Sequence, residues 1–127
     1  MAHKVQGVIA PSKSEPVSIE TIIVPNPGPG EVLVRVQASG VCHTDLHYRE
    51  GAITNDFPFL LGHEAAGVIE EVGNGVDDLT IGDFVILAWR APCGICRSCL
   101  RGRPWYCFDS CNARQPMTLV DGTVISP

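Results

Sequence analysis

Four of the six cysteines fall in one short run, with the spacing Cys93-x2-Cys96-x2-Cys99-x7-Cys107. Thiolates bind Zn²⁺ in a closed tetrahedron, and short x2 spacings let one loop wrap around the ion. Gly94 allows a tight turn within that loop. Because four thiolates leave no coordination position for a substrate, we predict a structural zinc site here rather than a catalytic one.

The same run is open to other chemistry. A thioredoxin-like CxxC pair requires a βαβ context, which the surrounding pattern lacks, and two disulfides require an oxidising compartment. A rubredoxin-like iron site is the remaining metal alternative. Arginines 97, 101 and 103 would partly offset the negative charge of a zinc–thiolate cluster. Cys111 lies just beyond Cys107, and we expect it to be a bystander.

A second, sparser set of candidate metal ligands lies earlier in the chain. Cys42 opens the loop after one predicted strand, and His63 and Glu64 stand just before another, so the two loops can converge at one edge of a sheet. A catalytic zinc takes three protein ligands and one open position, and the only uncommitted third ligand is Cys111. Asp45 is a candidate to orient the Cys42 loop or His63. Singly, these residues also fit a small core cysteine, a surface His–Glu pair and a helix N-terminal acid.

Two further polar residues follow Cys42 closely. Thr44 and His47 are suited to pass a proton between a metal-bound alkoxide and water. The same residues also fit a helix N-cap and a solvated histidine.

Alternating and β-branched residues predict a mainly β chain. The predicted strands cover residues 5–9, 19–24, 31–38, 66–72 and 84–89, and a hairpin joins 117–120 to 123–125 through Asp121-Gly122. Alternation in 31–38 places Val32, Val34 and Val36 on one face. Asn74-Gly75 is a turn signal. A short helix is predicted over Thr44–Arg49, with Thr44 as its N-cap.

Composition limits the partners. The chain has 127 residues, 45% of them hydrophobic and 18% charged, with a net charge of −5 and no basic run. This balance argues against nucleic acid or an anionic membrane as the main partner. With no apolar segment long enough for a signal peptide or a membrane span, we expect one domain in the reducing cytoplasm.

Three motifs together resemble the zinc-dependent medium-chain alcohol dehydrogenases. They are Gly40-Val-Cys-His-Thr-Asp45, Gly62-His-Glu-Ala-Ala-Gly67 and the four-cysteine run, in the order and spacing of that family, and the likeness covers essentially the whole chain. Longer strings, such as CHTDLHYREG, FPFLLGHEAAGV and RGRPWYCFD, look most similar to the mycothiol-dependent formaldehyde dehydrogenases within it. The resemblance implies a GroES-like, partly open β-barrel over residues 1–127, expected to be the N-terminal fragment of a catalytic domain. Residues 91–111 would form its structural zinc lobe.

The resemblance also implies metal ligands. Cys42 and His63 would bind a catalytic zinc, and Glu64 can approach that metal during ligand exchange. Asp45 would lie behind the ligands. A second, structural zinc would be held by Cys93, Cys96, Cys99 and Cys107.

The resemblance to this family also implies a reaction. An alcohol, or formaldehyde added to a thiol such as mycothiol, would give a hydride to NAD from a zinc-bound alkoxide. Thr44 would touch the substrate oxygen and, through the nicotinamide ribose, relay its proton to His47, while His43 would face the coenzyme pyrophosphate.

The resemblance extends past this chain. The third catalytic ligand of the family is a cysteine well downstream, and the nucleotide-binding Rossmann domain is absent from these 127 residues. We therefore expect this chain alone to be inactive and the full-length protein to be a homo-oligomer. The alternative functions are a dehydrogenase for small primary alcohols, a non-enzymatic GroES-like zinc-binding module and a one-iron electron carrier.

Overall fold

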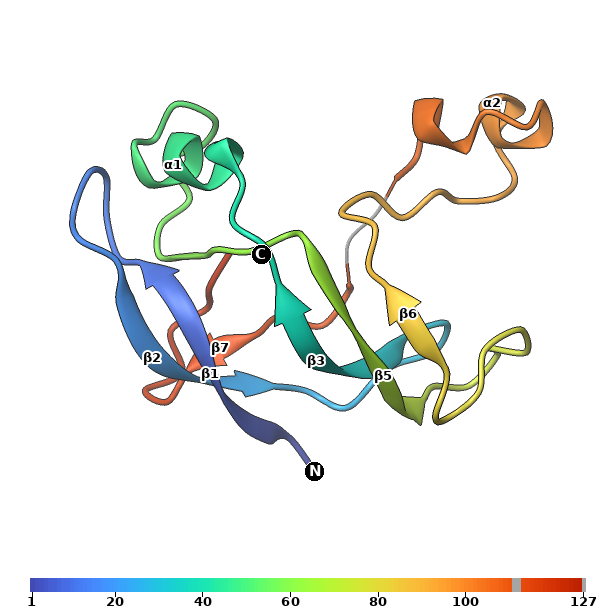
Figure 1. The fold of residues 1–127 in the computed structure, drawn as a ribbon, viewed down its shortest axis with the longest axis horizontal. Coiled ribbons are helices and arrows are strands. Elements are labelled where there is room, and N and C mark those ends of the chain that lie inside the picture. Colours follow the sequence, from blue (N-terminus) through green and yellow to red (C-terminus); the bar gives the residue numbers. More distant parts are fainter. Residues whose placement is uncertain (111–112, 127) are drawn as a thin grey trace.

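The computed structural model describes residues 1–110 and 113–126, and the mainly β prediction is confirmed (Figure 1). Neighbouring strands pair antiparallel in a four-stranded sheet of order β4-β1-β2-β7 and a three-stranded sheet of order β3-β5-β6. The strands are β1 (His3–Ala10), β2 (Ser18–Val24), β3 (Val32–Ser39), β4 (Phe59–Leu60), β5 (Ala65–Val72), β6 (Phe84–Ile86) and β7 (Thr118–Leu119). The helical segments are α1 (His43–Arg49), α2 (Arg97–Leu100) and the 3₁₀ turn η1 (Pro104–Tyr106). In the described part of the chain, no helix is long and apolar enough to cross a membrane.

The hydrophobic core lies against the four-stranded sheet. Ile9 of β1 and Ile22 of β2 pack with Ile125, and each is at most 3% exposed. Partly buried Leu60 and Leu119 pack against these three side chains. Burying each isoleucine contributes roughly 1.5–3 kcal/mol. The core therefore ties the first hairpin of the chain to its last one.

Two glycines allow β5 to lie very close to neighbouring backbone. At Gly67, a Cβ atom would collide with the carbonyl group of Arg35 in β3. At Gly73, it would collide with the carbonyl oxygen of Gly28, in the loop before β3. Any side chain at either position would push backbone aside, so these glycines permit the pairing of β3 with β5.

Helix α1 begins earlier than predicted. Its N-cap is Cys42, so the prediction of Thr44 as the cap is wrong. The Asp45 carboxylate accepts a hydrogen bond from the Cys42 backbone N–H at 3.0 Å, which satisfies this donor at the helix start. Thr44 consequently lies inside the first turn.

Strand β6 is shorter than the predicted 84–89 segment and ends at Ile86. The backbone N–H of Leu87 still bonds to the carbonyl of Ala65, at 2.9 Å, but Ala65 is the first residue of β5. Residues beyond Leu87 therefore have no β5 partner.

The predicted alternation of Val32, Val34 and Val36 does not give a uniformly buried face, because Val36 is 53% exposed. The pairing of β3 with β5 shifts register between Leu33 and Val34, where the extra residue lies in β5, and between Val36 and Ala38, where the extra residue lies in β3. The irregularity within β3 itself therefore comes after Val36 and does not interrupt the predicted alternation.

Both predicted turns form. Gly122 has φ 89° and Gly75 has φ 80°, a region that favours glycine. In the hairpin at Gly122, the Leu119 N–H donates to the Thr123 carbonyl at 2.8 Å.

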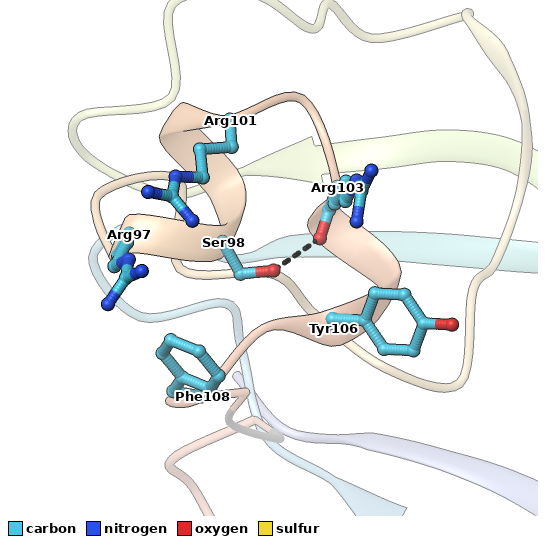
Figure 2. Close-up of a pocket in the computed structure, with 6 residues that line it drawn as sticks. All are labelled: Arg97, Ser98, Arg101, Arg103, Tyr106 and Phe108. Atoms are coloured by element: carbon cyan, nitrogen blue, oxygen red, sulfur yellow. Dashed lines mark hydrogen bonds between the residues drawn. The ribbon is translucent and has the colours of Figure 1, made fainter.

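The four-cysteine run contains helical turns that the sequence pattern did not predict. The buried Ser98 hydroxyl of α2 donates a hydrogen bond to the Arg103 carbonyl at 2.9 Å, which joins α2 to the turn before η1 (Figure 2). This segment follows β6, whereas α1 follows β3, and both lie beyond the same end of the three-stranded sheet (Figure 1).

A carboxylate fastens the chain after the four-cysteine run to the loop before β3. Glu31 accepts hydrogen bonds from the backbone N–H groups of Arg114, at 2.8 Å, and Gly28, at 2.9 Å. Gln115 adds a bond from its side-chain amide to the Asn26 carbonyl, at 2.7 Å. The bonds from Arg114 and Gly28 are the main causes that lower the pKa of Glu31.

The Glu31 contact gives stability a pH dependence. Because folding lowers the pKa of Glu31 below its ordinary value of 4.5, its contribution is present above that value and is lost as the pH falls through the folded pKa. We expect Glu31→Gln to lower the free energy of unfolding by about 1–2 kcal/mol at pH 7 and by less at pH values below about 4. Urea unfolding at the two pH values measures the difference.

The matched control is Glu20→Gln, which removes an exposed carboxylate of β2 that makes no hydrogen bond or ion pair with the described residues. Its stability should match that of the unchanged protein at neutral pH. A Glu31→Gln effect that is the same at both pH values would contradict the role of the ionised carboxylate.

Candidate metal centres

The pairing of β3 with β5 brings the first set of candidate ligands together. Ser39, at the end of β3, lies opposite Ala65, at the start of β5. The chain beyond the one strand therefore runs beside the chain before the other. Ligand atoms of Cys42, His63 and Glu64 lie within 4.8 Å of one another. The loops that the sequence predicted to converge do so.

Asp45 contacts both of the segments that carry these candidate ligands. One carboxylate oxygen accepts from the Cys42 N–H at 3.0 Å, and the other accepts from the Gly62 N–H at 3.2 Å. The second oxygen also lies 3.3 Å from His63 Nδ1. Asp45 is the only buried acidic residue in the described part of the chain. With Nδ1 directed at Asp45, Nε2 is the nitrogen left to bind a metal.

The electrostatics of the pair favour a metal-binding thiolate. Hydrogen bonds from Thr44 are the largest cause of a lowered pKa at Cys42, and its hydroxyl oxygen lies 3.4 Å from the sulfur. The pKa of His63 is raised, chiefly by its hydrogen bond with Cys42 and then by the charge of Asp45. A thiolate, an imidazole and a nearby carboxylate form a donor set that zinc accepts. The residues present therefore fit the metal that the resemblance implied.

Thr44 and His47, the two residues predicted to relay a proton, have different neighbours in the structure. Thr44 touches Cys42, as described above. The exposed ring of His47 instead packs edge-to-face against that of His43, with centroids 4.8 Å apart. Among the described residues, no hydrogen bond links Thr44 to His47.

A hollow of about 1080 Å³ adjoins this site. Cys42, Thr44 and His63 line part of it, beside aromatic walls that no sequence pattern indicates. Tyr48 and Phe59 stack with centroids 4.3 Å apart and form one such wall. The remaining lining comes from several loops and includes Ile53, Leu87, Trp89, Ser110 and Ala113. The size and the mixture of apolar walls with a few polar groups are typical of a small-molecule site.

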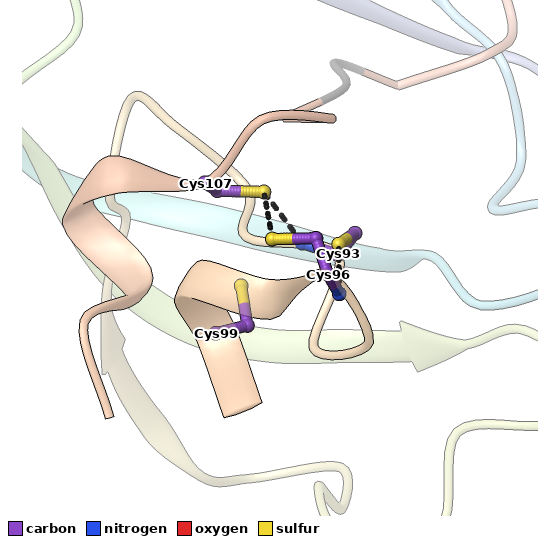
Figure 3. Close-up of side chains that lie close together, drawn as sticks. All are labelled: Cys93, Cys96, Cys99 and Cys107. Carbon is purple, nitrogen blue, oxygen red and sulfur yellow. Dashed lines mark hydrogen bonds between the residues drawn. The ribbon is translucent and has the colours of Figure 1, made fainter. Parts of the chain in front are cut away.

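The four-cysteine run forms a second cluster. Its four sulfur atoms lie within 4.8 Å of one another (Figure 3). The Cys93 N–H donates to the Cys107 sulfur at 3.3 Å, and the Cys96 N–H donates to the Cys93 sulfur at 3.2 Å. Gly94 has φ 77°, as expected for the tight turn between the first two cysteines.

The thiols of this cluster differ in acidity. A backbone hydrogen bond from Phe108 is the main cause that lowers the pKa of Cys96 to about 6. Burial, followed by the neighbouring thiols, raises the pKa of Cys99 to about 12. The raised pKa of Cys99 means that its thiol favours the protonated form unless a cation compensates the charge. The donor set fits a tetrahedral metal site. Cys111, named above as a bystander and as a spare ligand, lies outside the described residues.

The chain matches a family of known proteins. A model of the alcohol dehydrogenase GroES-like domain matches residues 28–124. The chain belongs to the zinc-type alcohol dehydrogenase family. This membership confirms the predicted GroES-like fold, although the shared zinc chemistry does not identify the substrate.

Individual members of the zinc-type alcohol dehydrogenase family resemble much of the chain. An S-(hydroxymethyl)glutathione dehydrogenase of Aspergillus oryzae is 40% identical over 93% of this chain and 31% of its own length. An NDMA-dependent alcohol dehydrogenase of Amycolatopsis methanolica is 40% identical over 82% of this chain and 28% of its own length. The crystal structure of an alcohol dehydrogenase zinc-binding domain protein from Burkholderia ambifaria superposes with a TM-score of 0.89, at 35% identity, over 98% of this chain and 36% of that one. The chain thus spans about a third of the length of these relatives.

Thr44 offers a test of the acidity of the first site. In the metal-free chain, Thr44→Val is expected to raise the pKa of Cys42, because the hydroxyl that stabilises its thiolate is lost. Alkylation of Cys42 by iodoacetamide should then slow at neutral pH, since the thiolate is the reacting form. Mass spectrometry of each cysteine-containing peptide across a pH series separates Cys42 from the other thiols.

Thr54→Val is the control, because the Thr54 hydroxyl bonds to Asp56 in an exposed loop. The pH profile of Cys42 should be the same in this variant as in the unchanged chain. An unaltered Cys42 profile in Thr44→Val would show that the hydroxyl does not stabilise the thiolate.

Proposed function

We propose that the protein is a zinc-dependent, NAD-linked dehydrogenase that oxidises the adduct of formaldehyde with a low-molecular-weight thiol, such as S-hydroxymethylmycothiol. The observation that carries the proposal is the Cys42–His63 pair, oriented by Asp45, at the wall of the 1080 Å³ hollow. The named activity of the Aspergillus relative supports a thiol-adduct substrate. Oxidation of small primary alcohols is the alternative, and the Amycolatopsis relative supports it.

In this proposal, the residues of the first site bind metal and position the alcohol. Cys42 and His63 supply two ligands, and Glu64 is close enough to exchange with them. A zinc ion held here would lower the pKa of a bound alcohol. Thr44, which contacts the Cys42 sulfur and lines the hollow, would accept a hydrogen bond from that alcohol and pass a proton on from its own hydroxyl, through the coenzyme ribose, to His47.

Coenzyme contacts complete the proposed site. His43 and His47 are exposed on α1 with their rings packed against each other, which leaves them accessible to the nicotinamide coenzyme. The ribose of the coenzyme would bridge the gap between Thr44 and His47. The aromatic walls at Tyr48 and Trp89 keep water away from the transferred hydride. We propose a cytoplasmic homo-oligomer for the full-length protein.

The substrate is tested on the full-length protein. With zinc and NAD, we expect kcat/KM to be highest for S-hydroxymethylmycothiol, lower for S-hydroxymethylglutathione and lowest for ethanol. NADH formation measured by absorbance provides the comparison. A preference for ethanol would replace the adduct proposal with the primary-alcohol alternative. The 127-residue chain alone should show no turnover, and turnover near that of the full-length protein would contradict the assignment of this chain to one part of the site.

The four-cysteine cluster is proposed to hold a structural zinc. We expect Cys96→Ser to lose this ion and to open residues 93–107, because metal binding and folding of such a loop are coupled. Trypsin should then cleave after Arg97 and Arg101 much faster than in the unchanged protein. Cys42→Ser is the control, since it alters only the first site and should leave that cleavage slow. Zinc content by mass spectrometry follows both losses, and an iron content would favour the one-iron carrier.

A further inference from the structure

The lobe of residues 93–110 carries a second hollow, separate from the candidate site. Its volume is about 470 Å³, and it is lined by Arg97, Ser98, Arg101, Arg103, Tyr106 and Phe108. Figure 2 shows Arg97 and Arg101 on one side of Ser98, and Arg103 and Tyr106 on its other side. None of these residues lines the larger hollow beside Cys42. The lobe hollow is therefore a distinct feature of the surface.

Positive charge is concentrated at this hollow although the chain as a whole is acidic. The net charge of the protein is −5, yet three of its nine cationic residues surround this one depression. No carboxylate is among the lining residues. Arg97 and Arg101 lie one turn apart at α2, an arrangement in which like charges destabilise a helix. Such clustering favours a bound counter-charge.

The protein does not supply that counter-charge in the described residues. Within residues 1–110 and 113–126, the guanidinium groups of Arg97, Arg101 and Arg103 make no ion pair and donate no hydrogen bond. By contrast, Arg35 pairs with Glu70 at 2.8 Å, and Arg49 donates to the Glu15 carbonyl at 3.0 Å. Each guanidinium carries five N–H donors in a fork that matches phosphate and carboxylate oxygens.

The negative charge of a zinc–thiolate centre would account for only part of the positive charge of Arg97, Arg101 and Arg103. Four thiolates around one divalent ion leave two negative charges, and the three arginines exceed them. The hollow also has apolar walls, since Tyr106 is 63% exposed and Phe108 is 75% exposed. Aromatic rings exposed beside unpaired guanidinium groups suit a ligand with both an anionic and an apolar part.

We propose that the hollow binds a small organic phosphate: a phosphate dianion held by Arg97 and Arg101, with its apolar body against Tyr106 and Phe108. Arg103 adds positive charge at the opposite side. Ser98 shapes the floor, because its hydroxyl is already committed to the Arg103 carbonyl. The site does not depend on the dehydrogenase proposal, since no residue of the Cys42 centre takes part in it.

The test uses the full 127-residue chain loaded with zinc and phenyl phosphate as the probe. Chemical-shift titration of the backbone amides is expected to show saturable binding confined to residues 97–108. Inorganic phosphate should bind more weakly, because it lacks the apolar body, and phenol should not bind. The affinity for phenyl phosphate should fall as salt is added. Absence of saturable binding, or equal affinity for the two phosphates, would overturn the proposal.

Variants locate the site. Arg101→Gln is expected to weaken phenyl phosphate binding by about tenfold or more, since it removes a charge-assisted contact. Arg101→Lys should lose less, because it keeps the charge without the fork. Arg35→Gln, at the paired arginine of β3, is the matched control and should bind like the unchanged chain. Zinc content shows whether the lobe stays folded in each variant.

The same variants separate anion binding from neutralisation of the metal cluster. If the arginines serve only the zinc–thiolate charge, Arg101→Gln will lose zinc to a chelator faster while no phenyl phosphate binds to any variant. That result would overturn the proposal. Retained zinc together with weakened phenyl phosphate binding supports it.

Discussion

The carboxylate of Asp45 contacts both segments that carry the first set of candidate ligands. It accepts one hydrogen bond from the backbone of Cys42 and one from that of Gly62, and it lies beside the ring of His63. Removing a carboxylate from water is costly unless its oxygens are satisfied. Here both oxygens are, so the buried charge becomes a rigid link between the end of β3 and the start of β5. The raised pKa of His63, whose main cause is its hydrogen bond with Cys42, depends on the closeness that this link maintains.

The four-cysteine cluster is built in a different way. Its sulfur atoms come from one continuous segment, and backbone N–H groups of that same segment point at them. The lobe contributes only Cys107 and Ser98 to the buried residues. Without a sizeable apolar core, its order depends on whatever holds the thiolates together. The first set of candidate ligands is supported by the paired strands β3 and β5, whereas residues 93–110 have no comparable support.

This difference explains what the sequence could predict. The spacing of the four cysteines predicted their cluster, because all four lie in one short continuous segment. The Cys42–His63 convergence required two strands to be recognised as partners, and alternation located both strands. The N-cap was misassigned because the preference of Thr44 for that position was outweighed by the bond between Asp45 and the Cys42 backbone. The stack of Tyr48 on Phe59 joins residues from α1 and β4, and no local pattern reports such a contact.

Glu31 also makes a long-range contact that no local sequence pattern predicts. In the sequence it is a polar residue at the start of a predicted strand, next to a Pro- and Gly-rich loop. In the fold its carboxylate holds the backbone of Arg114, far along the chain. The adjoining Ala113 lines the larger hollow. A charge at the base of β3 thus anchors the segment that carries Ala113, while the candidate metal ligands of the same pocket lie beyond the other end of that strand.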